Sequence, residues 1–351
     1  MEVLLKDLSE ARGVSGSEAA VRDVIFGAVR EHVDEHRVDA LGNLICLRKA
    51  RRPVQEGRWP RRVMVAAHMD EVGLMVMGIN ADGSLRFSSV GGIDDRILLS
   101  KQVLVGQDAV PGVIGYRPIH LIPRAERERV ADVSRAAIDI GATGKSGAEK
   151  LVKLGDYATF RTSFEVLDEQ GLRTVKGKAF DDRAGCAVLV ELLKDDYGID
   201  LYGVFTAQEE AGLRGARVAA YTVNPDVAFA LEGTVCDDLP KKKDLSPVTE
   251  VGKGPVITVM DRSFLADKRL VGLLVDSAKK LGIPYQFKQG AVGGSDAGVI
   301  HLTHEGVPSA AVSVPVRYIH APVSLLSLSD LDHTVQLMRE ALHTMEGGLE
   351  S

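Results

Sequence analysis

The chain has 351 residues, of which 45% are hydrophobic and 26% are charged, a balance typical of a folded globular protein with room for more than one domain. Its net charge of −6 gives no basic footprint for nucleic acid. Its longest apolar runs, Leu201 to Ala207 and Ala310 to Val314, fall far short of the roughly 20 residues that a membrane span needs. We therefore expect neither a nucleic-acid partner nor a membrane partner.

The cysteines and the N-terminus bear on the cellular compartment. Cys46, Cys186 and Cys236 are widely separated and odd in number, which argues against a disulfide framework and for a reducing compartment. The first residues lack the basic start and long apolar region of a secretion signal. A cytoplasmic location is therefore expected.

The first predicted elements lead to a polar cluster at the end of a strand. Ser15 to Glu18 has the spacing of a capping box and precedes an amphipathic run, which predicts a helix over residues 17 to 33. Residues 62 to 67 are apolar and β-branched and lead into His68 and Asp70, which predicts a buried strand. The C-terminal ends of such strands are where α/β sheets place their sites.

The middle of the chain has a different character. From residue 71 to 164, short apolar segments are separated by Gly, Asp and Pro turns, and helical periodicity is weak. From residue 177 onward, strand and helix patterns alternate again. The sequence therefore predicts one α/β domain interrupted by a β-rich insert. The later helices are expected over 183–195, 212–220, 266–281 and 329–346, and the later strands over 201–206, 227–231, 256–260 and 309–314.

Polar clusters fall at the ends of these strands or at the starts of the following helices. Each cluster alone has an ordinary interpretation, such as a satisfied histidine, a helix cap or a solvated acid. Together they supply two imidazoles and several carboxylates, a donor set that suits a pair of Zn²⁺, Co²⁺ or Mn²⁺ ions. Three carboxylates and a bridging hydroxide would balance the charge of two such ions. The clusters are His68 with Asp70, Asp181 with Asp182, Glu209 with Glu210, Glu232, and His320.

Six motifs carry a resemblance to a known family. They run in order as AHMDEVG (67–73), KAFDDRAG (178–185), TAQEEAGLRGA (206–216), ALEGT (230–234), GGSDAG (293–298) and RYIHAP (317–322). In these motifs the sequence resembles the M42 metallopeptidases, which include glutamyl and leucyl aminopeptidases and the tetrahedral aminopeptidases. The resemblance implies a zinc-peptidase-like, three-layer α/β/α catalytic domain with a mixed sheet, made by residues 1–70 and 165–351. Residues 71–164 would form a smaller β-rich dimerisation or oligomerisation domain.

The resemblance also implies a set of metal ligands. His68 and Glu232 would bind one divalent ion, Glu210 and His320 would bind the other, and Asp181 would bridge the two. The ions would be Zn²⁺ or Co²⁺, with Mn²⁺ as a third choice.

Two further roles follow from the same resemblance. Glu209 would be the general base that activates a metal-bridging water, and Asp70 would accept a hydrogen bond from the second ring nitrogen of His68. Position 232 is an aspartate in the usual form of the family, so Glu232 adds one methylene of reach. The implied reaction removes the N-terminal residue of short peptides with a free N-terminus, in a homo-oligomer that ranges from a dimer to a tetrahedral dodecamer.

Three alternatives remain at this point. A di-zinc carboxypeptidase or deacylase of the M20 or M28 families shares the motif order and the Glu209-Glu210 pair, whereas the β-rich insert, KAFDDRAG and RYIHAP favour M42. A metal-dependent binding protein without activity would not need Glu209. Glycoside cleavage needs two carboxylates that flank a sugar, which a ligand cluster with histidine does not provide.

Overall fold

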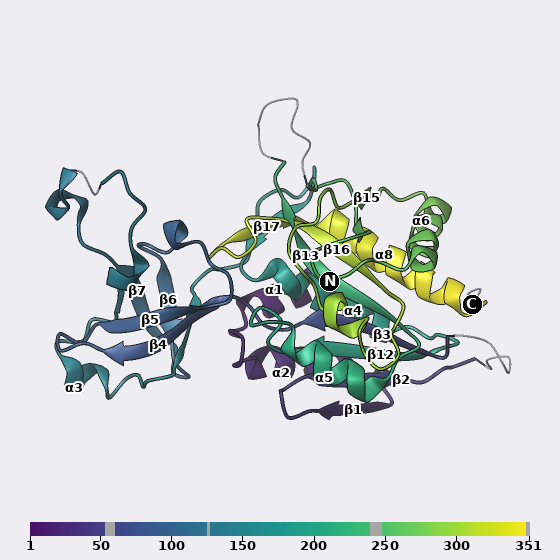
Figure 1. Cartoon of the computed structure of the whole chain (residues 1–351), viewed down its shortest axis with the longest axis horizontal. Coiled ribbons are helices and arrows are strands. Elements are labelled where there is room, and N and C mark those ends of the chain that lie inside the picture. The colour runs from purple at the N-terminus through teal and green to yellow at the C-terminus, as the bar shows by residue number, and fades with distance from the viewer. Residues whose placement is uncertain (53–59, 125–126, 239–247, 349–351) are drawn as a thin grey trace.

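A large mixed sheet carries the ends of the strands that position the site (Figure 1). The computed structural model describes residues 1–52, 60–124, 127–238 and 248–348. Within them the main path of the sheet runs β1-β2-β12-β3-β13-β16-β17-β11-β10, and β14 pairs with β16 and with β15. The strands are β1 (Glu35–Val38), β2 (Leu44–Arg48), β3 (Arg62–His68), β10 (Glu165–Val166), β11 (Thr174–Gly177), β12 (Asp200–Thr206), β13 (Val227–Cys236), β14 (Val256–Thr258), β15 (Gln286–Phe287), β16 (Ser309–Arg317) and β17 (Ser324–Ser327).

The centre of this sheet is parallel and its flanks are antiparallel. The pairs β12–β3, β3–β13 and β13–β16 are parallel, whereas β2–β12, β16–β17 and β11–β17 are antiparallel. The parallel strands therefore end at one edge of the sheet, where their C-terminal residues meet.

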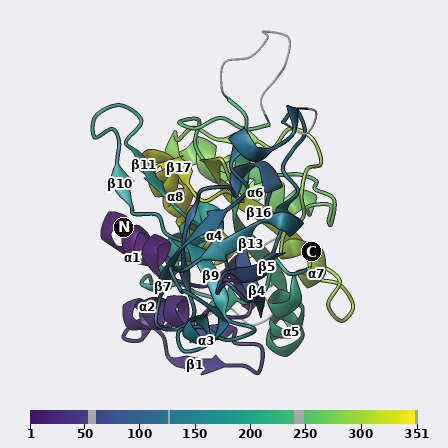
Figure 2. The same cartoon turned by 90° about the vertical axis from the view of Figure 1, so that its left-hand side faces the viewer.

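Helices cover both faces of the sheet, as the alternation of side chains along β3 requires. Val63 and Val65 pack into the core beneath α1, α2, α4, α6 and α8, whereas Met64 and Ala66 pack against α5 and α7. Figure 2 shows α1 and α2 on the opposite side of the sheet from α5 and α7. The predicted α/β/α layering is therefore confirmed. The helices are α1 (Glu2–Glu10), α2 (Ala19–Val29), α4 (Phe180–Leu193), α5 (Arg214–Val223), α6 (Lys268–Leu281), α7 (Ala297–Ile300) and α8 (Leu328–Met345).

The insert between β3 and β10 contains a closed barrel with its own apolar core. Its strands follow the order β4-β5-β8-β7-β6-β9, and the barrel projects from one end of the large domain (Figure 1). The predicted β-rich character is therefore present, while the role of residues 71–164 in assembly stays a prediction. The elements are β4 (Gly73–Ile79), β5 (Leu85–Val90), β6 (Gln102–Val105), β7 (Val110–Gly115), β8 (Ala137–Asp139), β9 (Tyr157–Phe160) and the short helix α3 (Lys145–Ala148).

The N-terminal segment differs from its prediction. Helix α2 is shorter than the helix expected over residues 17–33, and the capping box is absent. The Ser15 hydroxyl instead donates to Asp70 Oδ2 at 2.5 Å, and the Glu18 carboxylate accepts from the Gln208 N–H at 3.1 Å. These side chains tie the segment to neighbouring loops rather than cap the helix. Helix α1 was not predicted.

A buried ion pair fastens the barrel to the large domain. Glu71 follows β3, and its two carboxylate oxygens lie 2.6 and 2.8 Å from the Lys178 ammonium. The same carboxylate accepts from the Thr159 hydroxyl in β9 at 3.0 Å and from the Gly13 N–H at 3.1 Å. Burial, together with the charge of Arg183, lowers the pKa of Lys178 to about 8, although Glu71 opposes the shift. One carboxylate in the first connection to the barrel therefore binds both strand β9 of the barrel and Lys178 of the large domain.

The two strands at the ends of the main path of the large sheet are short and exposed. All four residues of β1 are exposed, and three of them are Glu35, His36 and Arg37. At the other end of the main path, β10 has two residues, both exposed. The described helices include none that is long and apolar enough to cross a membrane.

Candidate metal centre

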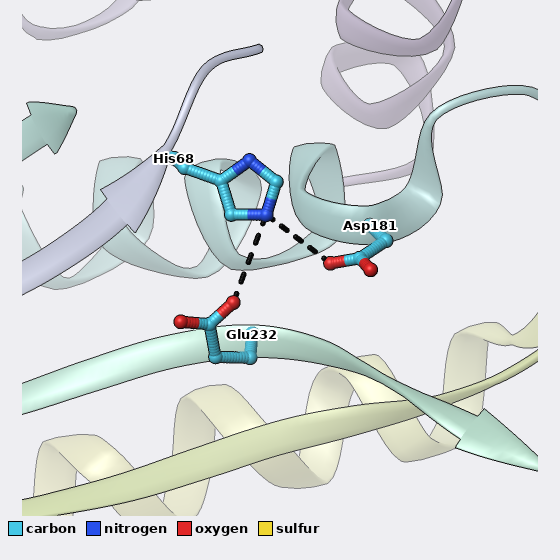
Figure 3. A group of neighbouring side chains, drawn as sticks. All are labelled: His68, Asp181 and Glu232. Carbon is cyan, nitrogen blue, oxygen red and sulfur yellow. Dashed lines mark hydrogen bonds and ion pairs between the residues drawn. The ribbon is translucent and has the colours of Figure 1, made fainter. Parts of the chain in front are cut away.

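His68 is the last residue of β3 and lies at the C-terminal end of the parallel strands. Its Nδ1 lies 3.1 Å from the main-chain oxygen of Asp70, and because a carbonyl can only accept, Nδ1 carries a proton. Its Nε2 therefore faces the other side, 3.2 Å from Asp181 Oδ1 and 3.7 Å from Glu232 Oε2 (Figure 3). This tautomer leaves Nε2 as the ligating nitrogen.

Asp70 lies beside His68 as predicted, and it also makes contacts that were not predicted. Its carboxylate lies 3.5 Å from His68 Nδ1, farther than its own carbonyl. The carboxylate also accepts from the main-chain N–H groups of Glu209 and Glu210, at 2.9 and 3.1 Å, and from Ser15. Burial would raise the pKa of Asp70, but His68 and these hydrogen bonds lower it overall. An ionised Asp70 therefore positions the loop that carries both glutamates.

A second group of ligand-type side chains forms around His320. Its Nε2 lies 3.2 Å from Glu210 Oε1 and 3.5 Å from Asp181 Oδ2. Its Nδ1 lies 2.9 Å from the main-chain oxygen of Gly92, which follows β5 in the insert. Burial would lower the pKa of His320, but Asp181 and Glu210 raise it to about 9. The insert therefore fixes the orientation of a side chain in the site.

Asp181 lies between the two groups and offers one carboxylate oxygen to each. His68, Asp181 and Glu232 bring their ligand atoms within 4.8 Å of one another, and so do Asp181, Glu210 and His320. Burial would raise the pKa of Asp181, but the two histidines lower it well below its ordinary value. An ionised Asp181 can therefore serve both groups.

The backbone around Asp181 departs from helical geometry at the start of α4. Asp181 and Asp182 have non-helical dihedral angles, and the peptide bond between them is cis. The Asp182 carboxylate turns inward, where it accepts from the Gly185 N–H at 2.9 Å and the His68 N–H at 3.3 Å. These contacts make Asp182 a support for the start of α4 and the end of β3.

The chemistry of the donor set fits two divalent ions. In both groups an imidazole nitrogen faces carboxylate oxygens, an arrangement that needs positive charge between them. Burial raises the pKa of Glu232 well above its ordinary value and that of Glu210 to about 7, and neighbouring acids raise both further although histidines oppose the shift. Nitrogen and carboxylate donors are those that Zn²⁺ and its neighbours accept.

Glu209 stands beside these groups at the wall of a cavity of about 460 Å³. Burial raises the pKa of Glu209 well above its ordinary value, and nearby acids including Asp296 and Glu210 raise it further against the influence of His68. The glycine-rich loop Gly293–Ser295 lines the same cavity. The cavity therefore holds a proton-accepting carboxylate next to both candidate ion sites.

Sequence reasoning missed two residues that support this site. The Ser15 hydroxyl was assigned to a helix cap but binds Asp70. The carbonyl of Gly92 was not singled out at all, because a main-chain oxygen leaves no signature in a sequence.

Comparisons with known proteins agree with the architecture and the motif order. A family model described as M42 glutamyl aminopeptidase matches residues 42–337. A protein of Acetivibrio thermocellus is 41% identical over 97% of both chains, and the lysyl aminopeptidase of Pyrococcus furiosus is 33% identical over 98% of this chain and 97% of its own. A TET aminopeptidase of a marine sediment thaumarchaeote superposes with a TM-score of 0.91 at 36% identity, covering 97% of this chain and 95% of its own.

A second solved structure is similar over the same extent. The TET1 peptidase of Pyrococcus horikoshii, described as able to assemble into a tetrahedron or a large octahedral shell, gives a TM-score of 0.84 at 35% identity and covers 97% of this chain and 98% of its own. The family model matches well over half of the chain, and these relatives cover 97% of it. The chain belongs to the M42 family of aminopeptidases.

Proposed function

We propose that the chain removes the N-terminal residue of short peptides with the help of two divalent ions. His68, Asp181 and Glu232 would hold one ion, and Asp181, Glu210 and His320 would hold the other. The observation that carries the proposal is the pair of histidine–carboxylate groups that share Asp181. The membership of the M42 family supports a divalent metal, and the donor types favour Zn²⁺, Co²⁺ or Mn²⁺.

Glu209 is the proposed general base and acid. Two divalent ions bound at the site would polarise the scissile carbonyl and lower the pKa of water. The Glu209 carboxylate removes a proton from the attacking water and returns it to the leaving amine. The carboxyl group holds the proton between the two steps. Asp70 keeps Glu209 and Glu210 in place through their main-chain N–H groups.

The acidic character of the site also suits the substrate's N-terminus. Glu209, Glu210 and Glu232 face one cavity, where a protonated or metal-bound amine finds several carboxylates. An acetylated N-terminus lacks this charge, so we expect N-acetylated peptides to be inert.

We also propose that the β-rich domain at residues 71–164 drives homo-oligomerisation, from a dimer to a tetrahedral dodecamer. The support is the likeness to the P. horikoshii TET1 peptidase, which is described as forming closed shells. A closed shell would admit short peptides and exclude folded proteins. A cytoplasmic location is proposed on the support of three free, buried cysteines, which suit a reducing compartment.

The roles of Glu209 and Glu210 can be separated by experiment. The Glu209→Gln variant should keep both ions and lose about 10²-fold or more in kcat on aminoacyl p-nitroanilides, since it removes only the base. The Glu210→Gln variant should lose metal content, measured by elemental analysis after dialysis. Glu305→Gln, at an exposed position outside the cavity, serves as the matched control. Loss of metal from Glu209→Gln would mean that the two glutamates have exchanged roles.

A further inference from the structure

The cavity that the candidate ligands line also contains a lysine. Lys288 directly follows β15, and its N–H donates to the Ile257 carbonyl of β14 at 3.1 Å. Its side chain lines the same cavity as Glu209 and Glu232. Among the described residues that line this cavity, Lys288 is the only lysine or arginine.

The Lys288 ammonium is available to a ligand. Within the described part of the chain, it makes no hydrogen bond or ion pair with another side chain or carbonyl. Its neighbours in the lining include apolar side chains such as Val292 and Val235, which do not compete for it. A cation in such a wall attracts a carboxylate more strongly than it would in open solvent.

The acid on the same wall is already saturated by the protein. Asp261 is 6% exposed, and its Oδ1 accepts from the Ser263 N–H, the Ser263 hydroxyl and the Phe264 N–H at 2.6, 2.7 and 3.0 Å. Its Oδ2 accepts from the Ser295 hydroxyl at 2.9 Å. This carboxylate therefore has little left to offer a basic side chain, whereas the Lys288 ammonium has no partner among the residues that the structure describes.

The sheet sets the span between Lys288 and the candidate ligands. Glu232 on β13 is in register with Ser313 on β16, and Thr258 on β14 is in register with Ala311 of the same strand β16. Ser313, Ala311 and Thr258 all line the cavity, so this face of the strands forms its floor. From β13 to β15 there are three strand spacings, about 14 Å in all. This span has room for three groups: the Glu232 side chain, one substrate residue and the four-carbon stem of Lys288.

From these observations we infer that Lys288 selects peptides whose N-terminal residue is glutamate or aspartate, by pairing with the side-chain carboxylate. The inference rests on the proposed aminopeptidase function and adds the residue that sets its side-chain preference. The family comparisons leave that preference open, because the model is described as glutamyl while the P. furiosus relative is a lysyl aminopeptidase. In this chain, the charge that the cavity wall offers to a substrate side chain is the positive charge of Lys288.

The test compares Glu-, Leu- and Lys-p-nitroanilide on the metal-loaded full chain. These substrates have no second residue and no C-terminal carboxylate, so a charge effect must come from the N-terminal side chain. The wild type should favour Glu over Leu by about tenfold or more in kcat/KM, and Lys288→Met should remove most of that ratio. Lys288→Glu should move the preference towards Lys. Lys253→Met, at an exposed lysine outside the cavity, is the matched control and should keep the wild-type ratio.

The results distinguish a failure of the proposed aminopeptidase function from a failure of the role given to Lys288. If the wild type cleaves none of the three substrates, the proposed function fails. If it cleaves Leu-p-nitroanilide but shows no preference for Glu, or if Lys288→Met keeps that preference, the role of Lys288 is wrong. A Lys288 effect that appears only with peptides carrying a free C-terminal carboxylate would also overturn it, because the lysine would then bind the other end of the substrate.

Discussion

The buried pair between Lys178 and Glu71 gives a sharp prediction about stability. Both side chains are 3% exposed, and the Lys178→Met variant would leave the Glu71 carboxylate buried without its main counter-charge. Removing one partner of a buried ion pair costs about 3 to 5 kcal/mol. Glu71 would keep Arg183 at 3.6 Å, the Thr159 hydroxyl and the Gly13 N–H, so part of that cost is offset. We expect a loss of about 2 to 3 kcal/mol in the free energy of unfolding.

A neighbouring lysine on the same segment supplies the control. Lys176 in β11 pairs with Glu165 at 2.9 Å, but the two side chains are 29% and 56% exposed. Exposed pairs contribute about 0 to 1 kcal/mol, so Lys176→Met should have little effect. The variants are compared by urea unfolding followed by circular dichroism. All are measured at one protein concentration, so that subunit association contributes equally to each apparent stability.

A double variant tests the physical reason. Burial lowers the pKa of Lys178 to about 8, which shows that its charge is costly to place inside the protein. Substituting both partners, as Lys178→Met with Glu71→Gln, should therefore be less destabilising than the sum of the single changes. Equal losses for Lys178→Met and Lys176→Met, or a fully additive double variant, would refute the reasoning.

Three further predictions concern the site, the thiols and the assembly. Asp70→Asn should lower kcat by about 10- to 100-fold, because its carboxylate holds the Glu209 and Glu210 loop, and wild-type turnover would contradict that role. Burial raises the pKa of Cys46 and Cys236 to about 12, so a thiol reagent such as dithiobis-nitrobenzoate should label no cysteine of the native protein and all three after denaturation. Light scattering of the metal-loaded protein should give a mass near that of a dodecamer, whereas a monomer at micromolar concentration would exclude both the cage and the dimer.

The strands and helices of the large domain could be predicted because their periodicity is strong. The apolar run that ends in His68 forms β3, and helix α4 begins where Asp181 was expected to precede a helix. Both positions lie at the C-terminal side of the parallel sheet, so chain order and strand direction alone bring them together. The β-rich character of the insert was visible for a similar reason, since its turns interrupt every apolar run.

The support of the site could not be predicted from local patterns. Ser15 and Glu18 have the spacing of a capping box. In the folded chain, however, the Ser15 side chain binds Asp70 and the Glu18 side chain binds the Gln208 N–H. The carbonyl of Gly92 orients His320 across 228 positions of sequence, a contact that depends on how the barrel is placed. Asp70 was expected to hold the His68 ring, and its larger role in holding two glutamate N–H groups follows only from the fold.

The end strands of the large sheet affect whether copies of the chain aggregate when they are crowded together. An open strand edge offers unpaired N–H and C=O groups on which another chain can extend the sheet, the usual route to aggregation. Here β1 presents charged residues along an exposed strand, and β10 ends the other side after two residues. Both features discourage strand addition, so copies packed at close quarters would meet through their folded surfaces and not by fusing their sheets.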